Sequence, residues 1–382
     1  MPKAYLDNHT VARPLPSAIE AMLPFLREHW GSTSAPHQMG QELFFALNKA
    51  TEWILEVLGA HSGDRFHFFS SNEEAIHHLY LSHYLHNVRN TGKNHLLTTT
   101  VEDAPVLAAF KQLEELGCHG KILAVNNQGQ LTADVLDAAL KPRVSLVSLS
   151  WANGLTGVIH PLEDLAKVCK EKGVLLHVDA SYAIGKFYLR LEDLPIDYLT
   201  FDGSLLHAPK GVAGLIAKEK SPLPAPLSAL VGVSVGGVAA LAAALDESSR
   251  MCDHLCLETA RLRDKLERGI VEAIPDAVVL LQSADRLPNC TAIAFPHVAS
   301  SDALLFQLHR KGVYASCGGG RLQKLSQILI ASGVEKSLAQ CALSFSLSFE
   351  TTEEEIDYAI QVVIASVQKL KSLSHHLFKG AP

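Results

Sequence analysis

The strongest constraint on the fold is the regular alternation of short apolar runs with helical stretches through the first two thirds of the chain. Seven such runs cover residues 66–69, 95–99, 121–125, 144–150, 174–178, 198–201 and 212–217. Helical spacing of apolar residues predicts helices over residues 41–58, 105–116 and 161–172. Because continuously apolar strands need cover on both faces, the pattern predicts an α/β fold with a mostly parallel, seven-stranded sheet between helices.

In the last third of the chain the predicted helices and strands no longer alternate regularly, which indicates a second, smaller α+β domain. The elements expected there are a long helix over residues 246–272, strands near 277–281, 291–295 and 342–347, and a helix over 301–311. Thr352 with Glu355 three positions later forms a capping-box pattern that opens a final helix. Because 382 residues exceed the roughly 250–300 that one core supports, we divide the chain into residues 1–250 and 251–382. We expect about the first 15 residues to pack on the smaller domain.

Charge and composition exclude several classes of protein. The chain has 33 basic and 40 acidic residues, a net charge of -7 and no run of lysines or arginines, so no nucleic-acid partner is expected. Residues 228–245 are long enough to span a membrane, but they are mostly Ala, Gly and Val and lead directly into Asp246. We interpret them as a loop that enters a buried helix, and expect no membrane association. A start without an apolar signal core, and seven irregularly spaced cysteines, indicate a cytoplasmic protein with reduced thiols.

Five blocks of sequence, taken in order, resemble one known family. They are residues 5–8 (YLDN), 20–31 (EAMLPFLREHWG), 177–180 (HVDA), 197–211 (DYLTFDGSLLHAPKG) and 351–357 (TTEEEID). Together they resemble the cysteine desulfurases of the class V aminotransferase superfamily, over nearly the whole chain. The resemblance implies the fold-type I architecture of enzymes that use pyridoxal phosphate (PLP), with a large PLP domain, a small C-terminal domain and a homodimer.

The resemblance also implies a set of site residues, of which two are kept. In the family, a lysine holds PLP as a Schiff base and an aspartate pairs with the pyridine nitrogen. Asp179 occupies the aspartate position at the end of the strand over residues 174–178, where ligand sites of parallel sheets gather. A carboxylate that caps a turn is the alternative interpretation of Asp179. Of the family's paired asparagines, Asn153 is kept and Gly154 replaces the second.

The Schiff-base lysine of the family is missing from its position. The family's Gly-Pro-Lys-Gly turn survives as residues 208–211 (APKG), and counting back from it places the lysine position at Leu205 and a histidine position at Ser204. A leucine side chain has no nitrogen and cannot form an imine. Lys210 belongs to the turn itself, and it would need a large backbone change to take over the role.

Four further positions lack the group that the resemblance implies. Glu73 stands at the threonine of the phosphate loop, where a carboxylate repels a dianionic phosphate. Asp103 replaces the ring-stacking histidine, Tyr182 the glutamine that contacts the ring hydroxyl, and Ser344 the arginine that binds the substrate carboxylate. Residues 222–238 should carry an arginine and a threonine to the partner's phosphate, and they contain neither.

The sulfur-accepting cysteine has one weak candidate, Cys317. Three glycines follow it, which favours a mobile, exposed loop, and Arg321 is near enough in sequence to lower the thiol pKa. A gap-free count instead places the nucleophile position at Gly318, so Cys317 is either a reactive thiol that carries a persulfide or a relic in a flexible turn. No metal site is expected, because the pairs Glu73–His77 and Glu74–His78 lie on different faces of one helix.

These losses favour a catalytically inactive protein that keeps the desulfurase fold without PLP, as a dimeric binding or scaffold protein connected to sulfur or iron–sulfur metabolism. The alternative is an active, PLP-dependent cysteine desulfurase or related lyase in which another lysine substitutes and Cys317 accepts sulfur. A third possibility is an acidic cleft, formed by Glu73, Asp103 and Asp179, that binds a cationic ligand or a metal. Besides a second copy of the chain, the expected partner is a sulfur-acceptor protein or an active desulfurase.

Overall fold

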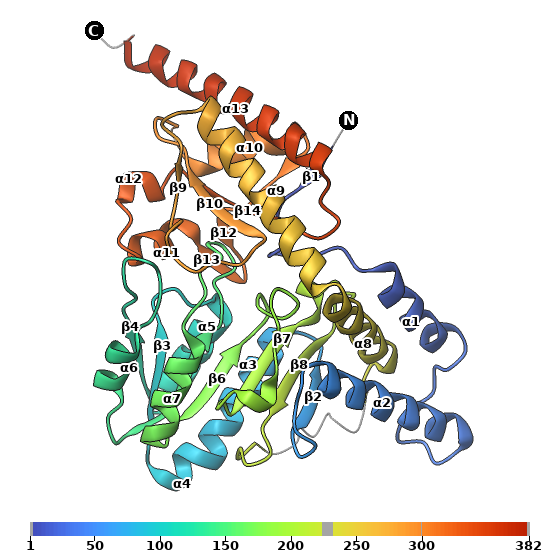
Figure 1. Ribbon diagram of the computed structural model, residues 1–382. Coiled ribbons are helices and arrows are strands. Elements are labelled where there is room, and N and C mark those ends of the chain that lie inside the picture. The colour runs from blue at the N-terminus through green and yellow to red at the C-terminus, as the bar shows by residue number, and fades with distance from the viewer. Residues whose placement is uncertain (1–2, 224–231, 299, 380–382) are drawn as a thin grey trace.

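A seven-stranded sheet forms the centre of the computed structural model, which describes residues 3–223, 232–298 and 300–379 (Figure 1). Across the sheet, the strands are β2 (Arg65–Phe69), β8 (Ala213–Ala217), β7 (Tyr198–Asp202), β6 (Leu175–Asp179), β5 (Val144–Ser150), β3 (His95–Thr99) and β4 (His119–Leu123). Strand β8 runs antiparallel to both of its neighbours, and the other pairings are parallel. The predicted mostly parallel sheet of seven strands is confirmed.

Helices cover both faces of this sheet because its strands are apolar on both sides. Helices α3 and α5 pack on one face, over Leu96 and Leu146, and helices α6, α7 and α8 cover the opposite face, over Leu97 and Val147. The helices up to residue 250 are α1 (Pro16–Arg27), α2 (Gln38–Val57), α3 (Asn72–His83), α4 (Arg89–Thr91), α5 (Ala104–Glu115), α6 (Ala133–Ala139), α7 (Leu162–Lys172) and α8 (Val235–Arg250). A π-helical turn (Tyr84–Val88) and two 3-10 turns (Leu191–Asp193 and Gly203–Leu205) complete this part. Figure 1 shows α1, α2 and α8 together beside the β2 edge.

The rest of the chain forms what we call the C-terminal unit, which covers one end of the large sheet (Figure 1). Its central sheet has the order β14-β10-β9 and is antiparallel. Its helices are α9 (Cys252–Ala273), α10 (Ser301–His309), α11 (Leu325–Ala331), α12 (Lys336–Ala339) and α13 (Glu353–Lys379). Its strands are β9 (Val278–Val279), β10 (Cys290–Ala294), β11 (Val313–Tyr314), β12 (Gly318–Gly319), β13 (Leu322–Lys324) and β14 (Ala342–Ser346). Strand β1 (Ala4–Tyr5), from the start of the chain, pairs in parallel with β11.

The structure divides one predicted helix in two, and it agrees with the prediction for the described part of residues 228–245 and for the capping box. The helix predicted over residues 246–272 is interrupted at Met251, where α8 ends and α9 begins. Of the stretch 228–245, residues up to 231 lie outside the described part, and the remainder enters the buried helix α8. None of the helices in the described residues is long and apolar enough to cross a membrane. The capping box is confirmed, because the backbone N–H of Thr352 donates to the Glu355 carboxylate at 2.9 Å and the N–H of Glu355 donates to the Thr352 hydroxyl at 3.2 Å.

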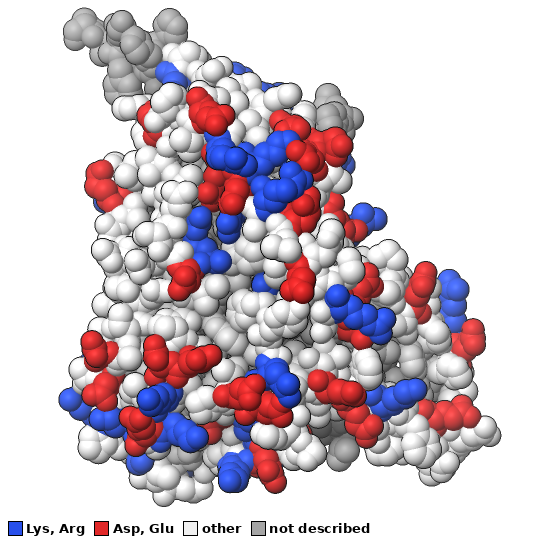
Figure 2. All heavy atoms as spheres, in the orientation of Figure 1, with Lys and Arg blue, Asp and Glu red and all other residues white. Residues whose placement is uncertain are grey.

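Acidic and basic side chains alternate over the α9 and α13 surface of the C-terminal unit (Figure 2). Arg261 and Lys265 of α9 both pair with Glu353 of α13, at 2.9 and 2.7 Å. Lys265 also pairs with Asp357 at 2.6 Å. Since these cations are matched by carboxylates on the same face, this surface has no basic stripe of the kind that binds a nucleic-acid backbone.

Candidate functional site

A buried cluster of carboxyl groups lies where parallel strands of the large sheet end. Asp179 is the last residue of β6, Asp202 is the last residue of β7, and Glu102 and Asp103 follow β3. All four are buried. The carboxyl ends of parallel strands share one edge of a sheet, so side chains that are far apart in sequence meet there. In Figure 1 the hairpin of β12 and β13 from the C-terminal unit lies over this edge.

Asp179 lies in this cluster, at the position that the sequence indicates for the pyridine partner. Its Oδ1 accepts hydrogen bonds from the backbone N–H of Ser181 at 2.9 Å and from the Ser181 hydroxyl at 2.5 Å. Its Oδ2 accepts from the side-chain amide of Asn72 at 2.7 Å. Burial raises the pKa of Asp179, although these donors and the charge of Arg321 act in the opposite direction. Both carboxylate oxygens therefore already have donors from the protein.

Asp103 and Tyr182, two of the substituted positions, bind each other. The Tyr182 hydroxyl donates to Oδ2 of Asp103 at 2.8 Å, and both side chains are buried. Burial raises the pKa of Asp103 to about 7, with Asp179 adding to the effect and Arg321 opposing it. Burial likewise raises the pKa of the adjacent Glu102 to about 8. Burial therefore favours the protonated form of both acids.

Arg321 enters the carboxyl cluster from the C-terminal unit, between β12 and β13. Its Nη1 bonds to Oδ2 of Asp202, and its Cζ lies 5.7 Å from the centroid of the Tyr182 ring. The expectation that Arg321 lowers the pKa of Cys317 is wrong, because the guanidinium bonds to Asp202 in the carboxyl cluster. The Cys317 thiol instead donates to Asp302 at 3.6 Å, and burial together with that carboxylate raises the thiol pKa.

Leu205, where the sequence resemblance places the Schiff-base lysine, belongs to an apolar cluster. It lies on the 3-10 turn after β7 and is 4% exposed. Val101, Leu155 and Tyr182 belong to the same cluster, which continues into the C-terminal unit. The neighbouring Ser204 donates to Oδ1 of Asp202 through both its backbone N–H, at 2.8 Å, and its hydroxyl, at 2.7 Å. The surroundings of residue 205 are thus those of a packed hydrocarbon side chain.

Gly154 provides the space that the Tyr182 ring fills. A β-carbon at residue 154 would lie 2.5 Å from Cζ of Tyr182. The preceding Asn153 is a structural residue, since its Oδ1 accepts from the backbone N–H groups of Leu155 and Thr156, both at 3.0 Å, and its amide donates to the Val101 carbonyl at 2.9 Å. The lack of a side chain at residue 154 therefore makes room for the ring of Tyr182.

The positions for phosphate and substrate carboxylate hold groups with other partners. At the start of α3, the Ser71 hydroxyl accepts from the N–H of Glu74 at 3.1 Å, and the Glu74 carboxylate accepts from the N–H of Ser70 at 3.0 Å. Glu73 is close enough to raise the pKa of Asp103. Ser344 donates its hydroxyl to the Leu155 carbonyl at 2.6 Å.

Taken together, these residues do not fit PLP. Leu205, which the family resemblance places where an amine would hold the aldehyde, is a packed hydrocarbon side chain, and the first turn of α3 carries carboxylates at the expected phosphate position. The guanidinium of Arg321 lies among the carboxyls that would surround the ring. Within the described residues, no group of three or more His, Cys, Asp and Glu side chains has the spacing of a metal site.

Sequence reasoning missed three residues of this site: Arg321 as a member of the cleft, Asp202 and Asn72. Asp202 ends a strand in the same way as Asp179, so its position alone could have placed it at the sheet edge. The acidic-cleft hypothesis for Glu73, Asp103 and Asp179 required a cation from outside the chain. Nothing in the sequence specified that Arg321 supplies this charge.

Comparison with known proteins identifies the family. Residues 4–232 match the model of the aminotransferase class-V family. The chain is 34% identical to a cysteine desulfurase of Nostoc sp. over 97% of its own length and 94% of the relative. It is 35% identical to a cysteine desulfurase of Cereibacter sphaeroides, with 98% of each chain covered.

The solved structure of a NifS-like protein superimposes with a TM-score of 0.89 and 28% identity, and covers 97% of this chain and 100% of the other. The expected fold is therefore confirmed. The chain belongs to the aminotransferase class-V family and is a cysteine-desulfurase-like member of it.

Proposed function

We propose that this protein is a catalytically inactive, cysteine-desulfurase-like binding or scaffold protein that functions without PLP. The observation that carries the proposal is Leu205, a packed hydrocarbon side chain at the position of the Schiff-base lysine. The family's chemistry begins with an imine between a lysine amine and the PLP aldehyde, and a leucine has no atom that can form this bond. The carboxylates of Glu73 and Asp103 support the proposal, because each stands where the cofactor would need a different group.

The missing groups also predict a large loss of affinity for PLP. Each charge-assisted hydrogen bond is worth about 1.5–3 kcal/mol, and the phosphate alone takes several of them. The carboxylate of Glu73 additionally repels the phosphate. Noncovalent binding at micromolar PLP is therefore not expected.

The test is a titration of the purified protein with PLP, followed by visible absorption and by borohydride reduction with mass spectrometry. An active cysteine desulfurase, treated identically, is the positive control. We expect no shifted absorption band and no reduced PLP adduct on any lysine. A reducible adduct on Lys210 or on another lysine would overturn the proposal.

The names of the relatives favour a second candidate, an active cysteine desulfurase, since the relatives compared above carry that name. In that case another lysine binds PLP and Cys317 accepts the sulfur as a persulfide. The candidate predicts sulfide release from cysteine in the presence of PLP and a thiol reductant, and Cys317→Ser abolishes this release. A chain without such activity, before and after addition of PLP, supports the inactive protein.

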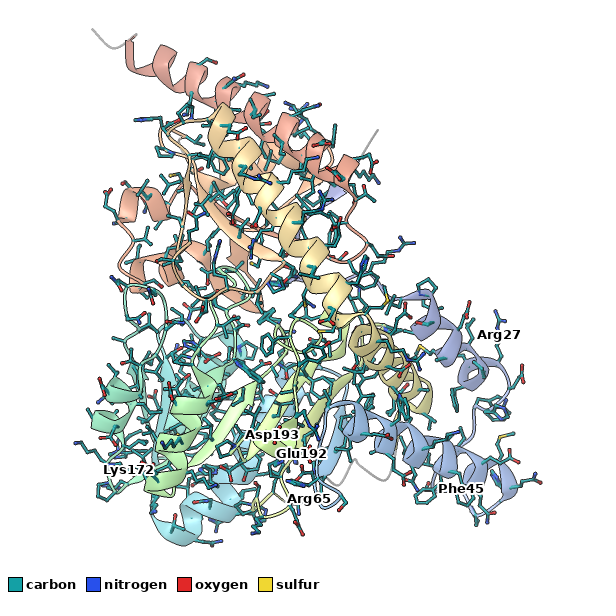
Figure 3. The ribbon with its side chains drawn as sticks, in the orientation of Figure 1. Arg27, Phe45, Arg65, Lys172, Glu192 and Asp193 are labelled. Carbon is teal, nitrogen blue, oxygen red and sulfur yellow. The ribbon has the colours of Figure 1, made fainter. Side chains whose placement is uncertain are left out.

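The proposal includes a homodimer. It is supported by exposed apolar side chains on α1, on α2 and on the loop between them. Phe45 is 70% exposed and Trp30 is 71% exposed, and Leu26 of α1 and Phe44 of α2 are exposed as well. Figure 3 shows Phe45 at the outer surface of α2, beyond the body of the large sheet. Apolar side chains gathered in this way mark an interaction surface, and a second copy of the chain is the proposed occupant. Light scattering on the wild type and on Phe45→Glu tests this, with a mass of twice 41.3 kDa expected only for the wild type.

We further propose that the partner of this dimer belongs to sulfur or iron–sulfur metabolism, either as a sulfur acceptor or as an active desulfurase. The support for this part is the family membership alone. Co-purification with a candidate acceptor protein, and with an active desulfurase, tests it. If neither candidate forms a complex with the protein at micromolar concentration, this part of the proposal is contradicted.

A further inference from the structure

The backbone holds Arg321 in position at the edge of the large sheet. The carbonyl oxygen of Arg321 accepts from the N–H of Ala104 at 3.0 Å, and the side-chain amide of Gln323 donates to the Glu102 carbonyl at 2.5 Å. The preceding Gly319 and Gly320 have φ angles of +110° and +66°, which other residues adopt at a cost. The glycine turn and these two bonds direct the side chain of residue 321 toward the carboxyl cluster.

Three carboxyl groups face the Arg321 guanidinium. Asp202 bonds to it directly, and Asp179 and Asp103 act on it through their charge. Burial alone would lower the pKa of Arg321, but Tyr182 and these carboxyls hold it above its usual value, so the side chain stays charged. Arg321 thus has one direct ionic partner, Asp202, and two further carboxyl groups within reach of its charge.

The aromatic ring of Tyr182 beside Arg321 suits a planar cation. The Cζ of Arg321 lies 5.7 Å from the centroid of the Tyr182 ring, within the range of a cation–π contact. The Nε and Nη2 atoms of Arg321 are buried without a hydrogen-bond partner, and so is Oδ1 of Asn72. A guanidinium provides a flat, delocalised charge with several donors, whereas an ammonium matches only the charge.

We infer that this cleft is a guanidinium-binding site, that Arg321 is its resident ligand, and that a free guanidinium compound takes the same place when the Arg321 side chain is absent. The cationic ligand of the acidic-cleft hypothesis is thus supplied by the chain itself. The inference rests on the proposed function, because a cofactor bound in the cleft would need the space that Arg321 fills.

The test is chemical rescue of the variant Arg321→Gly, which extends an existing run of glycines and leaves a hole of the size of the side chain. The variant should unfold at a lower temperature than the wild type. Methylguanidinium at about 10 mM should raise its midpoint by about 2 °C or more, by mass action on the folded state. Calorimetry should find one methylguanidinium bound per chain.

Three controls separate a site from a general salt effect. Methylammonium at the same concentration should give less than half of the rescue, because it lacks the planar donors. The wild type should not respond, since its own arginine fills the site. The double variant Arg321→Gly/Asp202→Asn should lose the rescue. Equal responses of all four samples, or no binding of methylguanidinium to Arg321→Gly, would overturn the inference.

A second measurement applies even if Arg321→Gly does not fold. In the otherwise intact chain, Asp202→Asn removes the direct ionic partner of Arg321, so trypsin should cut after residue 321 at least about tenfold faster than in the wild type, through local opening. An unchanged rate of cleavage there counts against the inference. The PLP titration is separate: a PLP adduct would refute the proposed function, whereas failed rescue without an adduct would refute only the guanidinium site.

Discussion

The contact between Gly154 and Tyr182 offers a sharp test of how the cleft is filled. A β-carbon at residue 154 would lie 2.5 Å from Cζ and 2.9 Å from the hydroxyl oxygen of Tyr182, well inside van der Waals contact. The backbone gives no second reason for glycine, because Gly154 does not have a positive φ. Gly154→Ala is therefore expected to destabilise the protein through the tyrosine ring.

The size of the effect follows from how firmly the ring is held. Tyr182 is 2% exposed and its hydroxyl is bonded to Asp103, so the ring cannot turn away from a new methyl group. Overpacking of this kind costs about 1–3 kcal/mol, and we expect a value in the upper half of that range. Tyr182→Gln removes the ring, and in that background Gly154→Ala should cost less than about 0.5 kcal/mol, which gives a coupling energy of about 1.5 kcal/mol or more.

Urea unfolding of the four proteins, followed by tryptophan fluorescence, measures these free energies. Gly63→Ala is a matched control, because its β-carbon would lie 2.5 Å from Cδ of Glu219, an exposed and flexible side chain that can move aside. The control should cost less than about 0.5 kcal/mol. An equal cost of Gly154→Ala in both backgrounds, or a cost no larger than that of the control, would refute the steric clash with Tyr182.

Three further predictions concern the cleft and the thiol. The folded-state pKa values of Asp103 (about 7) and Glu102 (about 8) lie above their unfolded values. Because the folded state holds these protons more tightly, the free energy of unfolding should fall by about 2–3 kcal/mol as pH rises from 6.5 to 8.5. Urea midpoints across this window measure the loss, and Glu102→Gln should remove most of it. Leu205→Lys should destabilise the protein by about 2–5 kcal/mol, because it replaces a packed side chain with a buried ammonium, and should still give no reducible PLP adduct in absorption and mass spectra. Burial and Asp302 raise the pKa of Cys317, so iodoacetamide should label this thiol more slowly than free cysteine at pH 8, and Asp302→Asn should speed the labelling measured by mass spectrometry.

Local patterns were sufficient to predict most of the fold. Most strands of the large sheet coincide with an apolar run, although β4 begins two residues before its run, at His119 and Gly120. The capping pair Thr352 and Glu355 marks the start of α13. The interruption at Met251 could not be predicted, because the apolar spacing of α8 continues into α9 without a proline or glycine. Only the packing of the two helices on different parts of the molecule distinguishes them.

The site was less predictable because its contacts join distant parts of the chain. Asp179 could be placed, since its strand and the position of its strand end are local properties. The bond between Arg321 and Asp202 joins residues 119 positions apart and depends on how the C-terminal unit meets the large sheet. The fit of the Tyr182 ring over Gly154 likewise depends on packing between separate loops, which no periodicity in the sequence encodes.

The pairing of β1 with β11 has a consequence for how the chain folds as it is made. Ala4 and Tyr5 pair with Val313 and Tyr314. The pairing of β1 therefore cannot form until its partner strand, about 300 residues further along the chain, has been synthesised. At roughly 5–20 residues per second, that interval lasts about 15–60 s on the ribosome. During synthesis the N-terminal segment therefore stays unpaired, and closing it onto β11 is among the last steps that join the two ends of the polypeptide.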